Sequence, residues 1–266
     1  MAITFCPVAS GSSGNCIYLS CGETKILIDA GLSGKRIEEG LNSFNRSCAE
    51  IDALFITHEH SDHIKGAGIL SRRYDLPVFA TEGTWAALDR YKFIGDVSPK
   101  NRRYIYREEN FYLNDICIHP FAVPHDAADP VGYAVLGGGY KAVVATDIGH
   151  VSDDVINNIQ DADILLLESN HDVDMVKNGR YPYPLKKRIL GNHGHLSNVT
   201  AGELLKDNIT AQLKHVFLGH LSSENNSPAL AYETVFNILL ANDIPVNKKF
   251  HLHLAERDKT GRLLKL

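Results

Sequence analysis

Three histidines and an aspartate lie within six residues of one another, in the segment that runs from Thr57 to His63. In an extended chain, residues two apart point to the same side, so His58 and His60 can bind one ion together. Asp62 and His63, at the start of an expected helix, can then face a second ion beside the first. Such side chains are seldom buried unless they are paired or bind a metal. A solvated polar loop is the alternative, but the segment favours a metal centre.

This spacing, preceded by the apolar run Ala53–Thr57, resembles the H-x-H-x-D-H signature of the metallo-β-lactamase superfamily. The resemblance implies a mixed α/β fold, an αββα sandwich with a dinuclear metal site at one edge of its sheets. The fold hosts thioesterases, lactamases and phosphodiesterases, so a metal site alone does not name the reaction.

The other motif residues of that superfamily can be found in order along the chain. Asp29 ends the apolar run Leu27-Ile28-Asp29 and matches an aspartate that orients the ligand loop. His125, Asp147 and His220 also follow strand-like runs, although each of them alone fits a core or surface group equally well. The resemblance implies that one ion is held by His58, His60 and His125, the other by Asp62, His63 and His220, and that Asp147 is shared.

The expected ligands are a mixture of imidazoles and carboxylates. Nitrogen-rich ligation suits Zn²⁺, whereas the carboxylates leave Mn²⁺ or Fe²⁺ open. Two such ions lower the pKa of a bridging water toward neutrality and polarise the substrate's acceptor oxygen. We therefore expect two divalent metal ions as cofactors, zinc or manganese, with iron as a further option.

Glu168 and His195 favour one branch of the superfamily. Glu168 ends the apolar run Ile164–Glu168, and His195 precedes Ser197, a good helix N-cap. The pair resembles the glutamate and histidine of the phosphodiesterase branch, which is known best from tRNA 3′-processing endonucleases. A helix-cap or surface histidine, and a carboxylate paired with a nearby cation, are the alternatives.

Cleavage of a P–O bond expels an alkoxide, and a protonated imidazole can stabilise the phosphorane or protonate the leaving oxygen. The expected mechanism is attack on phosphorus by a hydroxide that bridges the two ions, with His195, oriented by Glu168, assisting the leaving oxygen. A thioester needs this help less. We expect Asp62, Glu168 and His195 to be the catalytic residues.

Nearly the whole chain is similar to the YycJ/WalJ/VicX group of bacterial proteins. The similarity is carried by Val8–Cys16 and by the segments that contain Asp147, Glu168, His195 and His220. It implies a cytoplasmic metal-dependent DNA exonuclease that acts 5′ to 3′, tied to DNA repair or to a cell-wall two-component operon. The chain has no evident arm for the tRNA elbow and is too short for the inserted domain of larger nucleases, which disfavours structured RNA.

Three other functions stay open at this point. One is a phosphodiesterase for small or cyclic substrates, and another is a thioesterase of the glyoxalase II kind. The third is a metal-stabilised binding protein without turnover, which a complete ligand set disfavours.

A nuclease must hold backbone phosphates, although the net charge of −5 repels them. Two divalent ions offset part of this charge locally. Between Glu168 and His195 the chain carries a basic stretch that we expect to contact the DNA strand, and an ordinary solvated loop is an equal alternative. The stretch comprises Lys177, Arg180, Lys186, Lys187 and Arg188, interleaved with Tyr181 and Tyr183.

Strand patterns come first in hairpins and later alternate with helices, roughly twice over, which predicts two packed sheets with helices outside. No linker divides the chain, so we expect one domain over residues 1–266. The Gly-rich segment Ser10–Gly14 lacks the ending of a phosphate-binding loop and predicts a hairpin turn, which could still line a site. We expect strands at 3–8, 15–20, 25–29, 53–57, 77–80, 103–106, 116–122, 133–136, 141–146, 164–168, 215–218 and 249–255, and helices at 64–73, 84–92, 153–159, 199–206 and 228–241.

The composition is that of an ordinary globular protein, with 44% hydrophobic and 22% charged residues. No apolar run approaches the ~20 residues that span a bilayer, and the first residues do not have the pattern of a secretory signal. Five cysteines without a C-x-x-C pair fit reduced thiols. We therefore expect a cytoplasmic protein without a membrane partner.

Overall fold

Two seven-stranded sheets face each other in the computed structural model, which describes residues 1–266. The first sheet has the strand order β14-β1-β2-β3-β4-β5-β6. Its strands are β1 (Ile3–Ala9), β2 (Cys16–Cys21), β3 (Thr24–Ile28), β4 (Ala53–Phe55), β5 (Val78–Ala80), β6 (Arg102–Tyr104) and β14 (Leu264–Lys265). Strands β1 to β3 are antiparallel hairpin neighbours, and β3 to β6 are parallel.

The second sheet repeats this plan, with the order β13-β12-β11-β10-β9-β8-β7. Its strands are β7 (Phe111–Leu113), β8 (Ile116–Ala122), β9 (Val131–Gly137), β10 (Tyr140–Ala145), β11 (Ile164–Glu168), β12 (His215–Gly219) and β13 (His251–Leu254). Strands β7 to β10 are antiparallel, and β10 to β13 are parallel. Because parallel strands end at the same edge, residues that follow them are brought together there.

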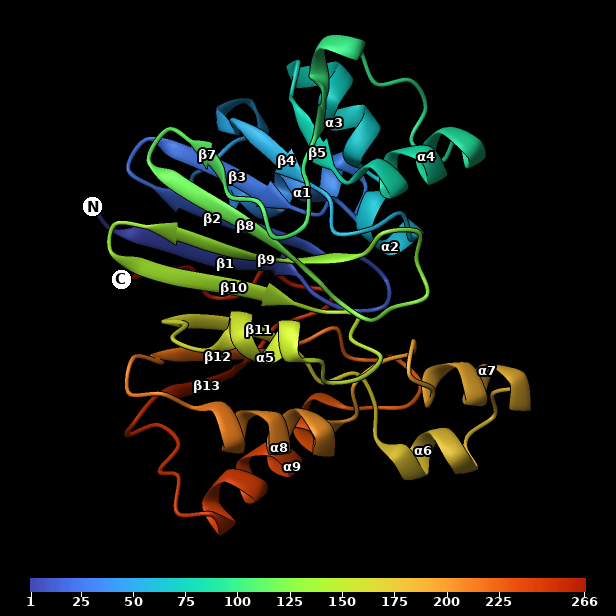
Figure 1. Cartoon of the computed structure of the whole chain (residues 1–266), viewed down its shortest axis with the longest axis vertical. Helices are drawn as coiled ribbons and strands as arrows, with labels where there is room; N and C mark the ends of the chain where they lie inside the picture. Colours follow the sequence, from blue (N-terminus) through green and yellow to red (C-terminus); the bar gives the residue numbers. More distant parts are fainter.

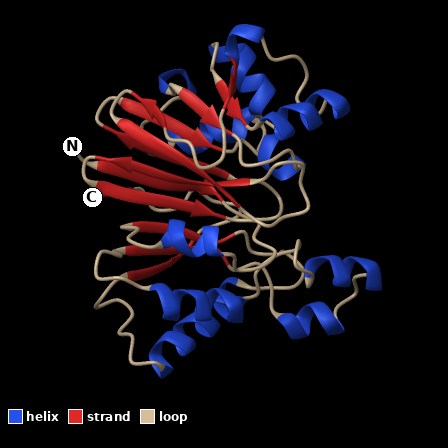
Figure 2. Cartoon of the chain, in the orientation of Figure 1, coloured by secondary structure: helices blue, strands red, loops and turns tan.

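Helices cover the outer face of each sheet (Figures 1 and 2). They are α1 (Gly34–Asn42), α2 (Ser61–Ile64), α3 (Ala67–Tyr74), α4 (Glu82–Tyr91), α5 (Asp153–Ile159), α6 (Val173–Asn178), α7 (Tyr183–Ile189), α8 (Asn198–Asn208) and α9 (Pro228–Ala241), with 3₁₀ turns at Cys48–Glu50 and Pro99–Asn101. Helices α1 to α4 accompany the first sheet, whereas α5, α8 and α9 accompany the second (Figure 1). The αββα sandwich expected from the sequence is confirmed.

Side-chain alternation along the strands divides the core into three layers. On β12, Phe217 points between the sheets and contacts Phe5 at a ring-centroid distance of 5.5 Å, while Val216 and Leu218 pack beneath the outer helices. A third cluster lies under α1, α3 and α4. The layer between the sheets takes residues from both halves of the chain, which supports our proposal of one domain.

Most expected elements are present, four of them with the expected bounds: β8, α5, β11 and α9. The single helix expected over residues 64–73 was wrong, because the chain breaks at Lys65-Gly66 between α2 and α3. The Gly66 amide donates to the Ala30 carbonyl at 2.6 Å, and a Cβ at Gly66 would lie 2.5 Å from the Leu32 carbonyl oxygen. The break is therefore fixed by close packing against the segment that follows β3.

Several elements were not expected from the sequence. Helices α1, α6 and α7 and the short strands β7 and β14 were missed, so the strand expected at 249–255 is not the last one. Strand β4 ends at Phe55 because the Thr57 amide bonds to the Asp29 side chain instead of to a strand. No helix has the length and apolar character that a membrane crossing needs.

Candidate metal centre and active site

The expected ligands lie at one edge of the sandwich, in the loops that follow the strands. Asp29 follows β3, Asp147 follows β10 and His220 follows β12. All three have left-handed backbones, with φ of 61°, 59° and 55°. Positive φ is uncommon outside glycine, and such strained residues cluster at functional sites. Each strand therefore turns sharply at the residue that bears the functional side chain.

His58, His60 and His125 form the first cluster, in which their potential ligand atoms lie within 4.8 Å of one another. His125 donates from Nδ1 to the Gly194 carbonyl at 3.0 Å, which leaves its Nε2 facing His60 Nδ1 at 3.3 Å. His58 Nε2 is buried and has no hydrogen-bond partner. A buried nitrogen without a partner, beside two others, fits a metal ligand set.

Asp62, His63 and His220 form the second cluster. Asp62 Oδ2 lies 3.5 Å from His63 Nε2 and 3.4 Å from His220 Nε2. Asp147 lies between the two clusters. Its carboxylate oxygens are 3.2 Å from His63 Nε2, 3.5 Å from His220 Nε2 and 3.6 Å from His125 Nε2. The structure therefore brings the seven side chains together at one edge. They form overlapping groups, which include the two expected sets, a group of His58, His63 and Asp147, and a group of Asp147, Glu168, His195 and His220.

Charge and burial suit two divalent cations. Burial lowers the pKa of His58 well below its usual value, so its imidazole is neutral and has a free lone pair. Burial acts to raise the pKa of Asp147, but His220 and His63 outweigh it and hold that pKa well below normal. Burial acts to lower the pKa of His63 and His220, but Asp147 and the neighbouring carboxylates outweigh it and raise both pKa values. Imidazole nitrogens and ionised carboxylates thus converge on the same buried space, and such donors suit divalent cations.

Asp29 orients the ligand loop through two contacts. Its Oδ2 lies 2.7 Å from His63 Nδ1, and its Oδ1 accepts the Thr57 amide at 2.8 Å. The Thr57 hydroxyl also donates to Asp29 and lies 3.0 Å from His58 Nδ1. With its Nδ1 proton held by Asp29, His63 presents Nε2 to the second cluster. Thr57 was missed as an orienting residue because only the fold brings it to Asp29.

Replacing Asp29 with asparagine is expected to weaken metal binding by about 10- to 100-fold, as losses of outer partners of ligands commonly do. The amide cannot accept from both His63 and Thr57 with the strength of a carboxylate. Competition with a fluorescent chelator measures the affinity, with exposed Asp258→Asn as the matched control. Unchanged affinity in the Asp29 variant would contradict this role.

Glu168 is fully buried at the end of β11 and contacts two histidines. Its Oε1 lies 2.8 Å from His195 Nδ1 and 3.0 Å from His220 Nδ1. Its Oε2 accepts the amides of Ile148 and Leu196. Burial acts to raise the pKa of Glu168, but His195 and the other donors outweigh it and lower the pKa to about 2. Glu168 is thus an ionised acceptor for His195 and also for the ligand His220.

His195 reaches the same edge from the segment before α8. Ser197 caps this helix by accepting the Thr200 amide at 3.1 Å, as its position in the sequence predicts. The His195 side chain is 16% exposed, and its ring centroid lies 5.1 Å from that of His125 and 5.3 Å from that of His220. Because Nδ1 faces Glu168, Nε2 lies on the opposite side of the ring, away from that carboxylate.

The structure adds an ion pair beside the first cluster that the sequence did not reveal. Asp126 Oδ1 lies 3.4 Å from His125 Nε2, and the carboxylate forms a two-point ion pair with Arg188, which includes a contact of 2.9 Å to Nη2. The position of Asp126 directly after His125 was the signal available in the sequence.

Most of the basic stretch lies on two short helices. Lys177 is on α6, and Tyr183, Lys186, Lys187 and Arg188 are on α7, while Arg180 and Tyr181 lie between them. The two helices project at the same end of the sandwich as α2 (Figure 1). Arg188 on α7 reaches the metal-ligand edge through Asp126, and Lys186 Nζ donates to the Lys177 carbonyl at 2.7 Å. The position of α7 allows basic side chains to be presented beside the site.

The Gly-rich segment Ser10–Gly14 joins β1 to β2 as expected, and it also supports the site. Ser10 Oγ accepts the His220 amide at 2.9 Å, and Asn15 Nδ2 lies 3.1 Å from His63 Nε2. Nearby, a Cβ on Gly31 would lie 1.6 Å from the Asp62 carbonyl oxygen, so only glycine fits there. Asn170 Nδ2 further donates to the His220 carbonyl at 2.8 Å.

Comparison with known proteins agrees with this geometry. The model of the Beta-lactamase superfamily domain matches residues 24–219. The chain is 41% identical over 254 residues to Exodeoxyribonuclease YycJ of Bacillus anthracis, covering 95% of each, and 40% identical over 259 residues to Exodeoxyribonuclease WalJ of Streptococcus pneumoniae, covering 97% of this chain and 96% of the relative.

Solved structures of low sequence identity share the fold. The metallo-beta-lactamase fold protein YhfI from Bacillus subtilis has a TM-score of 0.72 at 13% identity, and Zn(2+)-bound PqqB from Methylobacterium extorquens has 0.72 at 19%, each covering 100% of both chains. The chain therefore belongs to the metallo-β-lactamase superfamily, within the group that contains YycJ and WalJ.

Proposed function

We propose that this protein is a dinuclear metal-dependent phosphodiesterase that degrades DNA as a 5′ to 3′ exonuclease. The observation that carries the proposal is the Glu168–His195 hydrogen bond of 2.8 Å beside the two ligand clusters. A metal pair alone fits several hydrolytic reactions, whereas an oriented imidazole suits a poor leaving group. Relatives of nearly the same length named exodeoxyribonucleases support DNA as the substrate.

The proposed ligands are those that the geometry groups together. When bound, the ions polarise the phosphate oxygen and lower the pKa of a water molecule. The nitrogen-rich set favours Zn²⁺, and the carboxylates keep Mn²⁺ and Fe²⁺ as alternatives. We assign His58, His60 and His125 to one ion, Asp62, His63 and His220 to the other, and Asp147 to both.

The remaining steps fall to the side chains of this chain. Glu168, ionised and buried, holds the Nδ1 proton of His195, so the imidazolium can give its Nε2 proton to the departing sugar oxygen. Asp62 is 22% exposed, while Asp29 and Asp147 are each 3% exposed. Asp62 is the third proposed catalytic residue. Burial acts to raise its pKa, but His63 and His220 outweigh it and hold that pKa well below normal, so its carboxylate is an ionised acceptor at the second cluster.

The phosphates of the strand need cations near the site. Arg188 is 50% exposed beside the first cluster, and Lys186 and Lys187 lie on the same helix. We propose that α7 contacts the backbone of the DNA. We further propose a cytoplasmic location, which the free cysteines, four of them buried, support.

The test is an assay of metal-loaded protein on DNA and RNA strands labelled at either end. A 5′ to 3′ exonuclease releases a labelled mononucleotide at once from 5′-labelled DNA, and progressively shortened products from 3′-labelled DNA. Chelation is expected to abolish cleavage, and Mn²⁺ or Zn²⁺ to restore it.

Three results would contradict this function. Hydrolysis of bis-p-nitrophenyl phosphate without cleavage of single-stranded or duplex DNA indicates a small-substrate phosphodiesterase. Turnover of an acyl-glutathione without DNA cleavage indicates a thioesterase. Inertness after separate reconstitution with Mn²⁺ and Zn²⁺ indicates a protein that binds metal without turnover.

A further inference from the structure

Two solvent-exposed aromatic side chains stack on each other at the C-terminal end of α4. The rings of Tyr91 and Phe93 lie 5.1 Å apart between centroids with an interplanar angle of 18°, and they are 56% and 57% exposed. Neither belongs to any of the three core clusters. An aromatic pair that stays exposed buries little apolar surface, so this pair contributes little to the stability of the fold.

Each of the two aromatic residues lines a groove near the edge of the sandwich where the proposed metal ligands lie. Phe93 lines a groove of about 360 Å³ together with Asp62, one of the proposed ligands, and Lys65. Tyr91 lines a groove of about 400 Å³ together with Arg90 and with Asp126, the neighbour of the ligand His125. The stacked pair thus contributes to two grooves, of which one contains the proposed ligand Asp62 and the other contains Asp126, the neighbour of His125.

The backbone fixes the pair in place. Lys92 ends α4 with a left-handed φ of 51°, which turns the chain between the two aromatic residues. Beyond Phe93, Arg72 Nη1 donates to the carbonyls of Ile94 and Asp96 at 3.0 and 2.9 Å. The segment that carries the pair is therefore anchored to α3.

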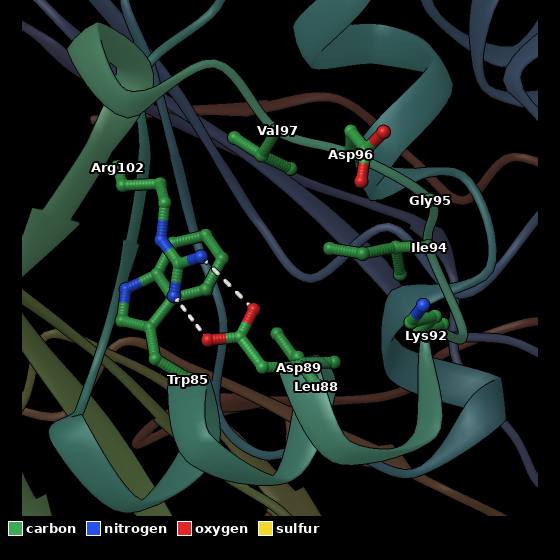
Figure 3. A pocket seen from close by; sticks show the side chains of 9 residues that line it. All are labelled: Trp85, Leu88, Asp89, Lys92, Ile94, Gly95, Asp96, Val97 and Arg102. Atoms are coloured by element: carbon green, nitrogen blue, oxygen red, sulfur yellow. Dashed lines mark hydrogen bonds and ion pairs between the residues drawn. The ribbon is translucent and has the colours of Figure 1, made fainter.

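A neighbouring pocket of about 420 Å³ lies beside this segment, and its polar lining residues are Asp89, Lys92, Asp96 and Arg102 (Figure 3). The Arg102 guanidinium lies 4.3 Å from the Trp85 ring and forms a two-point ion pair with Asp89. This contact secures α4 from the side. Around the two aromatic rings lie the cations Lys65, Arg90 and Lys92.

Those cations suit a polyanion. Lys65, Arg90 and Lys92 are all exposed, and the first two line the same grooves as the rings. Proteins that bind single strands combine cations along the backbone with aromatic rings on which bases stack, whatever the sequence. A duplex hides its base faces, so only an unpaired strand can use such rings.

We propose that Tyr91 and Phe93 form a stacking platform for unpaired bases of a single DNA strand at the metal centre. The proposal rests on the nuclease function proposed above, and adds that the enzyme prefers a single-stranded end and reads bases without sequence specificity. Lys65 and Arg90 contact the phosphates on either side of the stacked bases.

The test measures binding by fluorescence anisotropy with metal-loaded protein. The probes are a phosphorothioate oligothymidylate, which resists cleavage, and a fully abasic strand of the same length and charge. The unchanged protein is expected to bind the thymidylate about tenfold or more tightly than the abasic strand, since stacking of one base on an aromatic ring is of that size. Tyr91→Ala with Phe93→Ala is expected to lose this preference.

Two further variants guard against trivial causes. The exchange Tyr91→Phe with Phe93→Tyr keeps both rings and is expected to keep the preference. Tyr112→Ala removes a ring that is 71% exposed on β7, outside both grooves, and is also expected to keep it. A preference that survives the double alanine change, or that is absent from the unchanged protein, overturns the platform.

The platform and the nuclease function fail in different ways. If the protein cleaves natural DNA but shows no preference for bases in the binding assay, the stacking platform is wrong and the nuclease function stands. If the metal-loaded protein shows a base preference that depends on both rings but does not cleave DNA, the stacking platform stands and the nuclease function is wrong.

Discussion

Replacing His195 with alanine is expected to lower kcat on DNA by about 10²- to 10⁴-fold while both metal ions stay bound. His195 Nδ1 faces Glu168, and its ring lies beside the clusters but is not one of the proposed ligands. The fold should survive, because Glu168 keeps His220 and the amides of Ile148 and Leu196 as partners. Metal content and turnover of labelled DNA are measured on the same sample.

The leaving group gives a sharper readout of proton donation. A nitrophenolate departs without a proton, whereas a sugar alkoxide needs one, so the variant should lose much less activity on a p-nitrophenyl ester of thymidine phosphate than on DNA. His193→Ala, an exposed change in the same loop, serves as the control. Full activity with full metal content, or equal losses on both substrates, would rule out this role.

Changing Glu168 would test this step less cleanly. Its Oε1 contacts His195 at 2.8 Å and the proposed ligand His220 at 3.0 Å. A loss of activity would then mix proton transfer with metal binding. The His195 variant separates the two.

Replacing Asp147 with alanine is expected to release at least one ion and to lower activity by about 10³-fold or more. Two ions supply several kcal/mol of charge stabilisation in the transition state, and a loss of that size corresponds to such a factor. The carboxylate lies within 3.6 Å of His63, His125 and His220, so it contacts histidines of both clusters.

Elemental analysis after dialysis and assays across a range of Mn²⁺ concentrations measure the effect. Asp154→Ala, an exposed change on α5, is expected to retain two ions and full activity. Two ions bound at unchanged affinity in the Asp147 variant would remove its assignment as the shared ligand.

The sequence by itself determined the sandwich and predicted which side chains gather at its edge. The spacing of His58, His60 and Asp62 is local, and short apolar runs mark strand ends, so both can be recognised without knowing the fold. Strands β8 and β11 have their expected bounds for the same reason, since β-branched and large apolar residues are bounded by turns.

The tertiary structure decided how those side chains are held and what surrounds them. The left-handed turns at Asp29, Asp147 and His220, the double contact of Glu168, and the ion pair of Asp126 with Arg188 all depend on distant segments meeting. The break at Gly66 was missed because close packing there overrides local propensity. Helix α1, by contrast, has local signals that predict a helix, the N-cap Ser33 and an amphipathic pattern. The Tyr91–Phe93 stack depends on one left-handed residue between them, and no hydrophobic period in the sequence indicates such a turn.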